Sequence, residues 1–308
     1  MRIIFAVLAM LALTTVASSA ATPVDPASPE AAVLLPVQVL RKNDFKAFFA
    51  SLPAEDQAKA QAQWKEAQVN PKAKDTKQFN DTMTMLLAPD AVDQLMAQAE
   101  PKLQEMDPQQ MSQGLMMISG LLPMLIQQSQ MQNQKAGAKP MDADMQKSIA
   151  MIQSLMNDAS QWVLTSGIND PNKLRTAIEH VVAGAKALKV ADAAEMQALQ
   201  LTEFLDRLGP MVQEVKQALA VYDLQVDPFL DSFTAKSAGE GDKRVLTVGF
   251  TAFGNPYEMP VKVENKGGTW SVSPENNSGL NDLQKMMGGG AGGDGGFAPP
   301  AEPGNDVK

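Results

Sequence analysis

Cysteine is absent from this 308-residue chain, and there is a single histidine, His180. Without cysteine the chain forms no disulfides, no thiolate metal sites and no thiol nucleophile. A serine triad would have to use His180, which lies on the opposite side of its predicted helix from the apolar stripe. We therefore expect His180 to be a surface residue, and we expect no catalytic residues and no metal site.

Aromatic residues make up only 5% of the chain, and the net charge is −9. The chain therefore offers few aromatic platforms for sugars, and its lysines and arginines form no cluster. A nucleic-acid partner is not expected, because such proteins carry a basic patch. The basic face that draws peripheral proteins to anionic lipid is missing too. No cofactor is expected.

The apolar run at residues 3–13 is about 11 residues long, well short of the ~20 that span a bilayer. Arg2 precedes this run, and small residues ending in Ser18-Ser19-Ala20 follow it. This pattern predicts a signal peptide over residues 1–20 with cleavage before Ala21. Cleavage removes Arg2 as its only charge and makes the net charge −10. We expect a periplasmic or secreted protein of a Gram-negative bacterium, without a transmembrane segment after cleavage.

Helical spacing of apolar residues begins after a proline-rich extended leader at residues 21–30 and predicts a helical domain over residues 31–226. Proline beside an acidic residue marks expected helix starts at Pro53, Pro89, Pro108 and Pro171. Gly209-Pro210 is expected to separate two helices, over residues 192–208 and 210–223.

Residues 108–134 contain no ionisable side chain. Nine large apolar residues between positions 115 and 126 cover most of a helical circumference. The remaining sector holds Ser119, Gly120 and Pro123, which would let a neighbouring helix approach closely. We predict that this segment is buried at the centre of the helical domain.

The apolar period changes to two in the C-terminal part of the chain, where Leu246, Val248, Phe250 and Ala252 alternate with smaller or polar residues. Turns at residues 254–256 and 265–268 then predict an antiparallel β-meander over residues 227–275, to which residues 229–235 could add a strand. Since a lone meander of this size is marginally stable, its apolar face should pack on the helices. The predicted fold class is mainly α (α+β), with a multi-helix bundle-like domain followed by a small antiparallel β-meander packed on it.

The Gly/Pro-rich residues 276–308 are predicted to be a tail, disordered from about residue 287. Its Gly288-x-Gly290-x-x-Gly293 pattern follows no strand and opens no helix, so it does not indicate dinucleotide binding. Asp142-x-Asp144 lacks the glycine and glutamate of a calcium loop.

Methionine is abundant, and ten of the 20 methionines lie between Met106 and Met156. The candidate binding residues are Met117, Met124 and Met131, spaced by seven, with Met141 and Met145, spaced by four. Three interpretations remain open: core filling, a pliable surface for a protein partner or apolar ligand, and thioether binding of Cu(I).

The preferred hypothesis is an exported, non-catalytic binding or scaffolding protein of the bacterial envelope that uses its Met-rich helices. A carboxylate-based hydrolase of envelope polymers and a thioether Cu(I) binder are the alternatives. The oligomeric state is left open.

Overall fold

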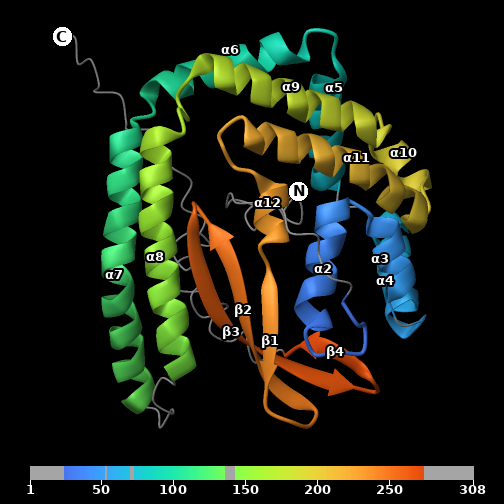
Figure 1. The fold of residues 1–308 in the computed structure, drawn as a ribbon. Helices are drawn as coiled ribbons and strands as arrows, with labels where there is room; N and C mark the ends of the chain where they lie inside the picture. The colour runs from blue at the N-terminus through green and yellow to red at the C-terminus, as the bar shows by residue number, and fades with distance from the viewer. Residues whose placement is uncertain (1–23, 53, 70–72, 136–142, 274–308) are drawn as a thin grey trace, which may run out of the picture.

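A layer of helices and one antiparallel sheet make up the computed structural model, which describes residues 24–52, 54–69, 73–135 and 143–273 (Figure 1). The predicted signal peptide, the predicted tail, Met141 and Asp142 lie outside these residues. The helices are α2 Ala31–Lys42, α3 Phe45–Ser51, α4 Ala54–Val69, α5 Ala73–Leu87, α6 Ala91–Glu105, α7 Pro108–Lys135, α8 Ala143–Thr165, α9 Pro171–Leu188, α10 Ala193–Ala198, α11 Leu201–Ala220 and α12 Val226–Asp231. The strands are β1 Thr234–Ala238, β2 Lys243–Ala252, β3 Asn255–Lys266 and β4 Thr269–Val272. The predicted fold class is confirmed.

The sheet has the order β1-β2-β3-β4, with every neighbouring pair antiparallel. Phe253 and Gly254, both at positive φ, join β2 to β3. A two-residue hairpin loop of this kind matches the right-handed twist of the strands, and Gly254 adopts it without strain. The turn therefore lies one residue before the predicted position, and Asn255 and Pro256 belong to β3. Residues 226–231 form a helix, so the predicted extra strand begins only at Thr234.

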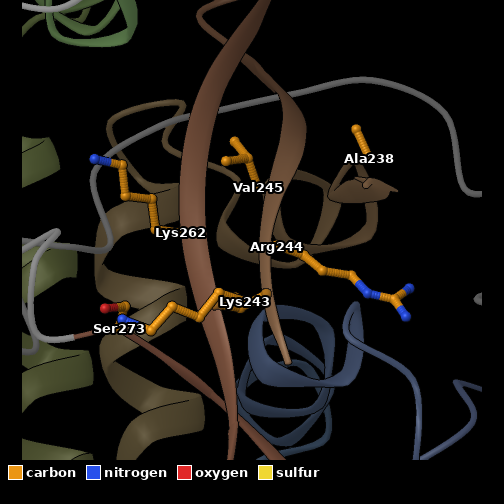
Figure 2. A pocket seen from close by; sticks show the side chains of 7 residues that line it. Ala238, Lys243, Arg244, Val245, Lys262 and Ser273 are labelled. Atoms are coloured by element: carbon orange, nitrogen blue, oxygen red, sulfur yellow. The ribbon is translucent and has the colours of Figure 1, made fainter. Parts of the chain in front are cut away.

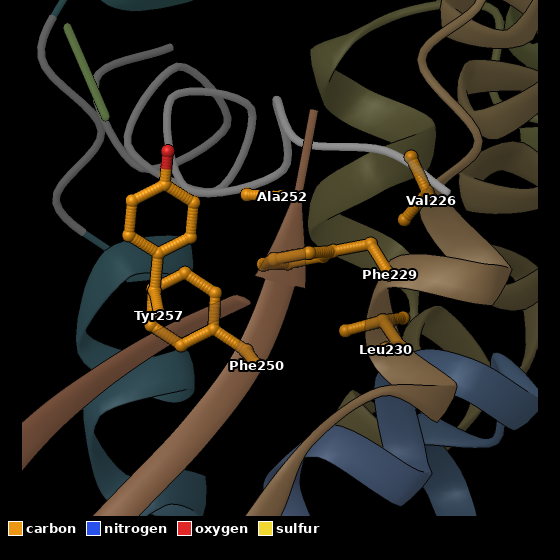
Figure 3. Packing of buried hydrophobic residues seen from close by; sticks show 6 residues of the cluster. All are labelled: Val226, Phe229, Leu230, Phe250, Ala252 and Tyr257. Atoms are coloured by element: carbon orange, nitrogen blue, oxygen red, sulfur yellow. The ribbon is translucent and has the colours of Figure 1, made fainter. Parts of the chain in front are cut away.

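One face of the sheet is apolar and packs on helices, as the alternating pattern predicted. Phe250 stacks on Tyr257, with ring centroids 5.6 Å apart, and Phe229 from α12 meets Phe250 edge-on at 5.9 Å (Figure 3). Val33 of α2 packs over the neighbouring cluster that contains Trp270. Burying each such large side chain contributes about 1.5–3 kcal/mol, so the sheet depends on these helices.

A buried charge joins α2, α11 and α12. The ammonium of Lys216, whose side chain is 3% exposed, donates to the carbonyls of Leu40 at 2.5 Å and Arg41 at 3.3 Å, and pairs with Asp227 at 2.6 Å. Arg41 in turn binds Asp227 at 3.2 Å and Asp231 at 2.8 Å. Burial lowers the pKa of Lys216, while its hydrogen bond to Asp227 acts in the opposite direction. Lys216 thus satisfies the last carbonyls of α2 and fixes that helix to the other two.

Helix α11 runs unbroken through Gly209 and Pro210, so the predicted separation into two helices at this point is wrong. Gly209 is buried against Asn43, which follows α2; a Cβ atom at this position would lie 2.5 Å from the backbone oxygen of Asn43. Pro210 removes one helical hydrogen bond, but the packing of α11 against α9 and α3 holds the helix together.

Helices α7 and α8 form a hairpin at one edge of the molecule, with α8 lying between α7 and the sheet (Figure 1). The predicted start of α7 is confirmed, because Asp107 accepts a hydrogen bond of 2.8 Å from the amide of Gln109. Within the residues that the structure describes, no helix is long and apolar enough to cross a membrane.

Replacing Lys216 with methionine keeps the volume of the side chain but removes the buried cation. We expect the free energy of unfolding to fall by about 3 kcal/mol, because Asp227 and two carbonyls lose their partner. Urea denaturation followed by circular dichroism measures this loss. Lys77→Met is the control, since its ion pair with Asp81 is exposed to solvent and its loss should hardly change stability. Equal losses in the two variants would contradict the role given to Lys216.

Two glycine-to-alanine variants should change stability in opposite directions. Gly209→Ala is expected to destabilise by about 2 kcal/mol or more, because the new methyl group overlaps a backbone oxygen. Gly120→Ala in α7 meets no atom within 4 Å and should stabilise by ~0.5–1 kcal/mol through helix propensity. Thermal unfolding distinguishes the two, and a stabilising Gly209→Ala would refute the close packing described above.

Candidate functional site

The outward side of α7 carries large apolar side chains that no other part of the described structure covers. Met117 is 65% and Met124 64% exposed, and Met116, Ile118 and Leu121 are each 43–45% exposed. We call these five residues the outer α7 face. The prediction that this helix is sealed inside the bundle is therefore wrong.

Two serines of α7 are buried on its inward side. Ser112 and Ser119 are 2% and 5% exposed. Ser119 lies against α8, where the Gln153 side chain donates to the Ser119 carbonyl at 3.1 Å and the Ser119 hydroxyl donates to the Gln153 carbonyl at 3.4 Å. The expected close approach of a helix at Ser119 is confirmed, whereas Gly120 and Pro123 of the same predicted sector are exposed.

The outer α7 face thus differs from the exposed side of an ordinary surface helix. Such a helix turns its apolar stripe to the core and its polar side chains to water. In α7 the serines face the neighbouring helix and the methionines face outward. The physical reason is the number of neighbours: α7 packs mainly on α8, so a single side of the helix can be covered.

The predicted binding residues divide into two groups. Met117 and Met124 both lie on the outer α7 face, two helical turns and about 10 Å apart along the axis. Met131 lies in α7 and Met145 in α8, but the placement of their side chains is outside what the structure describes, as is Met141 altogether. The sequence pattern did not single out Met116, Ile118 and Leu121, which the helix places beside Met117 and Met124.

His180 is not the free surface residue that was expected. Its Nδ1 lies 2.8 Å from a carboxylate oxygen of Glu214, and the two side chains are each about one-third exposed between α9 and α11. The pair therefore joins the two helices.

A second polar group ties α8 to the β2–β3 hairpin. Asp158 accepts hydrogen bonds from the hydroxyl of Tyr257 and, at 2.7 Å, from the side-chain amide of Asn255. Burial, followed by the hydrogen bond to Asp158, raises the pKa of Tyr257 to about 12. The tyrosine is therefore a neutral donor at physiological pH and holds α8 against the sheet.

A shallow cavity of about 220 Å³ lies at the end of the sheet and is lined by Lys243, Arg244 and Lys262 among others (Figure 2). Arg244 points away from Lys262 and stacks over Trp270, with its guanidinium carbon 5.2 Å from the ring centroid. Lys243 and Lys262 also have interaction partners. The volume is below the ~300–1,000 Å³ of ordinary ligand pockets.

The two alternative functions, a carboxylate-based hydrolase and a thioether Cu(I) binder, stay predictions. Asp227 and Asp231 lie one helical turn apart, but both carboxylates bind Arg41 and serve the fold. Among the described residues, no three His, Cys, Asp or Glu side chains converge in a way that could hold a metal ion.

Comparison with protein-family models, with curated proteins and with solved structures finds no match for this chain. The functional argument therefore depends on the outer α7 face itself.

The high pKa of Tyr257 can be measured directly, because the chain contains only two tyrosines. Titration at 295 nm should show one tyrosine ionising near pH 12; Tyr257→Phe should remove that component and Tyr222→Phe should retain it. A tyrosine whose folded pKa is raised stabilises the fold below pH ~10 and loses that effect as the pH rises toward 12. The loss of stability in Tyr257→Phe, about 1 kcal/mol at pH 7, should shrink over this window. Ionisation of Tyr257 near pH 10 would contradict the contact.

Proposed function

We propose that the chain is an exported, non-catalytic binding or scaffolding protein of the bacterial envelope, periplasmic or secreted, that contacts a partner through the outer α7 face. The observation that carries this proposal is the exposed apolar surface of α7, with Met117 and Met124 facing solvent and Ser119 facing α8.

The exposed apolar area supports a contact role. From the exposed fractions, the outer α7 face presents roughly 500 Å² of side-chain surface, within the ~300–600 Å² of the largest patch on a typical monomer, which is often functional. Scattered exposed apolar residues need no explanation, but these five are contiguous on one helix. Covering them with a partner removes this surface from water, which is favourable by about 25 cal/mol per Å² before the costs of association.

Methionine suits a binding surface. Its side chain is unbranched and its thioether is polarisable, so it adapts to apolar surfaces of irregular shape. Three of the five residues of the outer α7 face are methionines. The face is therefore pliable rather than shaped for one rigid ligand.

A protein partner fits this face better than a lipid surface. Helices that lie in a membrane interface place lysine and arginine beside the apolar stripe and often carry tryptophan. Residues 108–134 contain none of these, and the chain has a net charge of −9, which anionic lipids repel.

Export is proposed from the N-terminal pattern. Arg2, the apolar run at residues 3–13 and the small residues before Ala21 together match a cleavable signal peptide.

The proposal can be tested by site-specific photocrosslinking in the cell that makes the protein. A benzophenone side chain at Met117 should give a discrete protein adduct in the periplasmic or secreted fraction, on a chain that begins at Ala21. The matched control is the same side chain at Leu164 of α8, which is exposed but lies off the outer α7 face. Absence of an adduct at Met117, or equal adducts at both positions, would contradict a specific contact there.

A further inference from the structure

We infer that the partner of the outer α7 face is a second copy of this chain, paired antiparallel about a two-fold axis that passes at Leu121. This inference builds on the proposed function, because both use the same face, and it adds the identity and geometry of the partner.

The spacing along α7 is that of a helix-pairing seam. Met117, Leu121 and Met124 follow one another at intervals of four and three, and all three are exposed. Alternating intervals of three and four residues keep side chains on the line where two helices meet. The same intervals extend back to Gly114 and forward to the polar Gln128 and to Met131 of the sequence.

Glycine on this side of α7 leaves room for a second helix. An added Cβ at Gly114 or at Gly120 would meet no heavy atom within 4 Å. Gly120 is exposed and lies one position before Leu121. Small residues at such positions let the backbones of two helices approach closely.

The charges around α7 favour a copy of the same chain in an antiparallel orientation. Residues 108–134 are uncharged, so two acidic molecules can meet along this helix without repulsion within the seam. Asp107 and Lys135 flank the segment, and each stands 14 residues from Leu121. With Leu121 on the axis, Asp107 therefore lies level with Lys135 of the partner subunit, whereas a parallel pair would bring Asp107 close to its own copy. Antiparallel helix dipoles also attract.

The available area fits a dimer of moderate affinity. The five residues of the outer α7 face offer roughly 500 Å² per molecule, and Gln113, Gly120 and Pro123 are exposed around them. A standard interface buries about 800 Å² per partner. Since α7 lies at the edge of the molecule, a second hairpin can reach the face (Figure 1). We therefore expect a dimer that dissociates in the micromolar range.

Sedimentation velocity of the mature chain over about 1–300 μM tests the inference. We expect a monomer–dimer equilibrium in which Leu121→Glu raises the dissociation constant at least ~30-fold, because it places two carboxylates at the axis. Leu164→Glu is a closely matched control, since both leucines are 43% exposed on neighbouring helices. It should leave the equilibrium unchanged. Circular dichroism checks that both variants fold.

Single cysteines test the orientation, since the chain has none of its own. On mild oxidation, Leu121→Cys should form a covalent dimer with itself. A mixture of Met117→Cys and Met124→Cys should form a mixed dimer, while each alone should crosslink much less. A parallel pair would instead crosslink each position to itself. Leu164→Cys should stay monomeric.

Several outcomes would overturn the inference: a monomer throughout the concentration range, equal effects of Leu121→Glu and Leu164→Glu, or crosslinks of the parallel pattern. The monomer could instead float with anionic or zwitterionic vesicles in a way that depends on Met117 and Met124. This result would assign the face to lipid and would also overturn the inference. A monomer whose benzophenone adduct at Met117 is a different protein would overturn only this inference and leave the proposed function in place.

Discussion

The arrangement of the molecule depends on one buried cation, the ammonium of Lys216. A charge this deeply buried is costly unless every hydrogen-bonding position is used, and here two carbonyls at the end of α2 and the carboxylate of Asp227 use them. The contact joins three segments that are distant in sequence, and Arg41 extends it to Asp231. Because α2 and α12 both cover the apolar face of the sheet, the position of the sheet depends on this cation.

The sheet in turn determines where α8 lies, and α8 determines the surroundings of α7. Met151 and Leu155 of α8 pack on the cluster around Phe250, and Asp158 binds the β2–β3 hairpin through Tyr257. On the other side, the indole of Trp162 donates to the carbonyl of Tyr222 at 2.8 Å. Because these contacts occupy the other sides of α8, α7 packs on its remaining side. Helix α7 is therefore the outermost helix of the hairpin.

Much of the fold could be predicted from local patterns. The main error was the predicted burial of α7, and no local pattern contains the information on whether a helix is covered by others. Period-two alternation at Leu246–Ala252 and the proline-led helix starts at Ala54, Ala91 and Pro171 are local, and the structure has them where expected. The continuity of α11 through Pro210 depends on its packing against α9 and α3, which are contacts with other segments of the chain. The apolar circumference of α7 led to the wrong prediction that the helix is buried, because burial also requires neighbours and their number is set by the whole topology. The sequence did not indicate Leu121 as part of the candidate site, because its exposure follows from the position of α8.

The number of neighbours limits how much of α7 is covered, and the hydrogen bonds of Ser119 determine which side that is. Ser112 and Ser119 are buried on the inward side, and Ser119 is held by two hydrogen bonds with Gln153 that fix the rotation of the helix. Turning α7 to bury Met117 would break both bonds and bury a glutamine amide without a partner, at about 1–3 kcal/mol for each unsatisfied group. The polar contact with α8 therefore keeps the methionines in solvent, so their exposure is specified by the sequence of the hairpin itself.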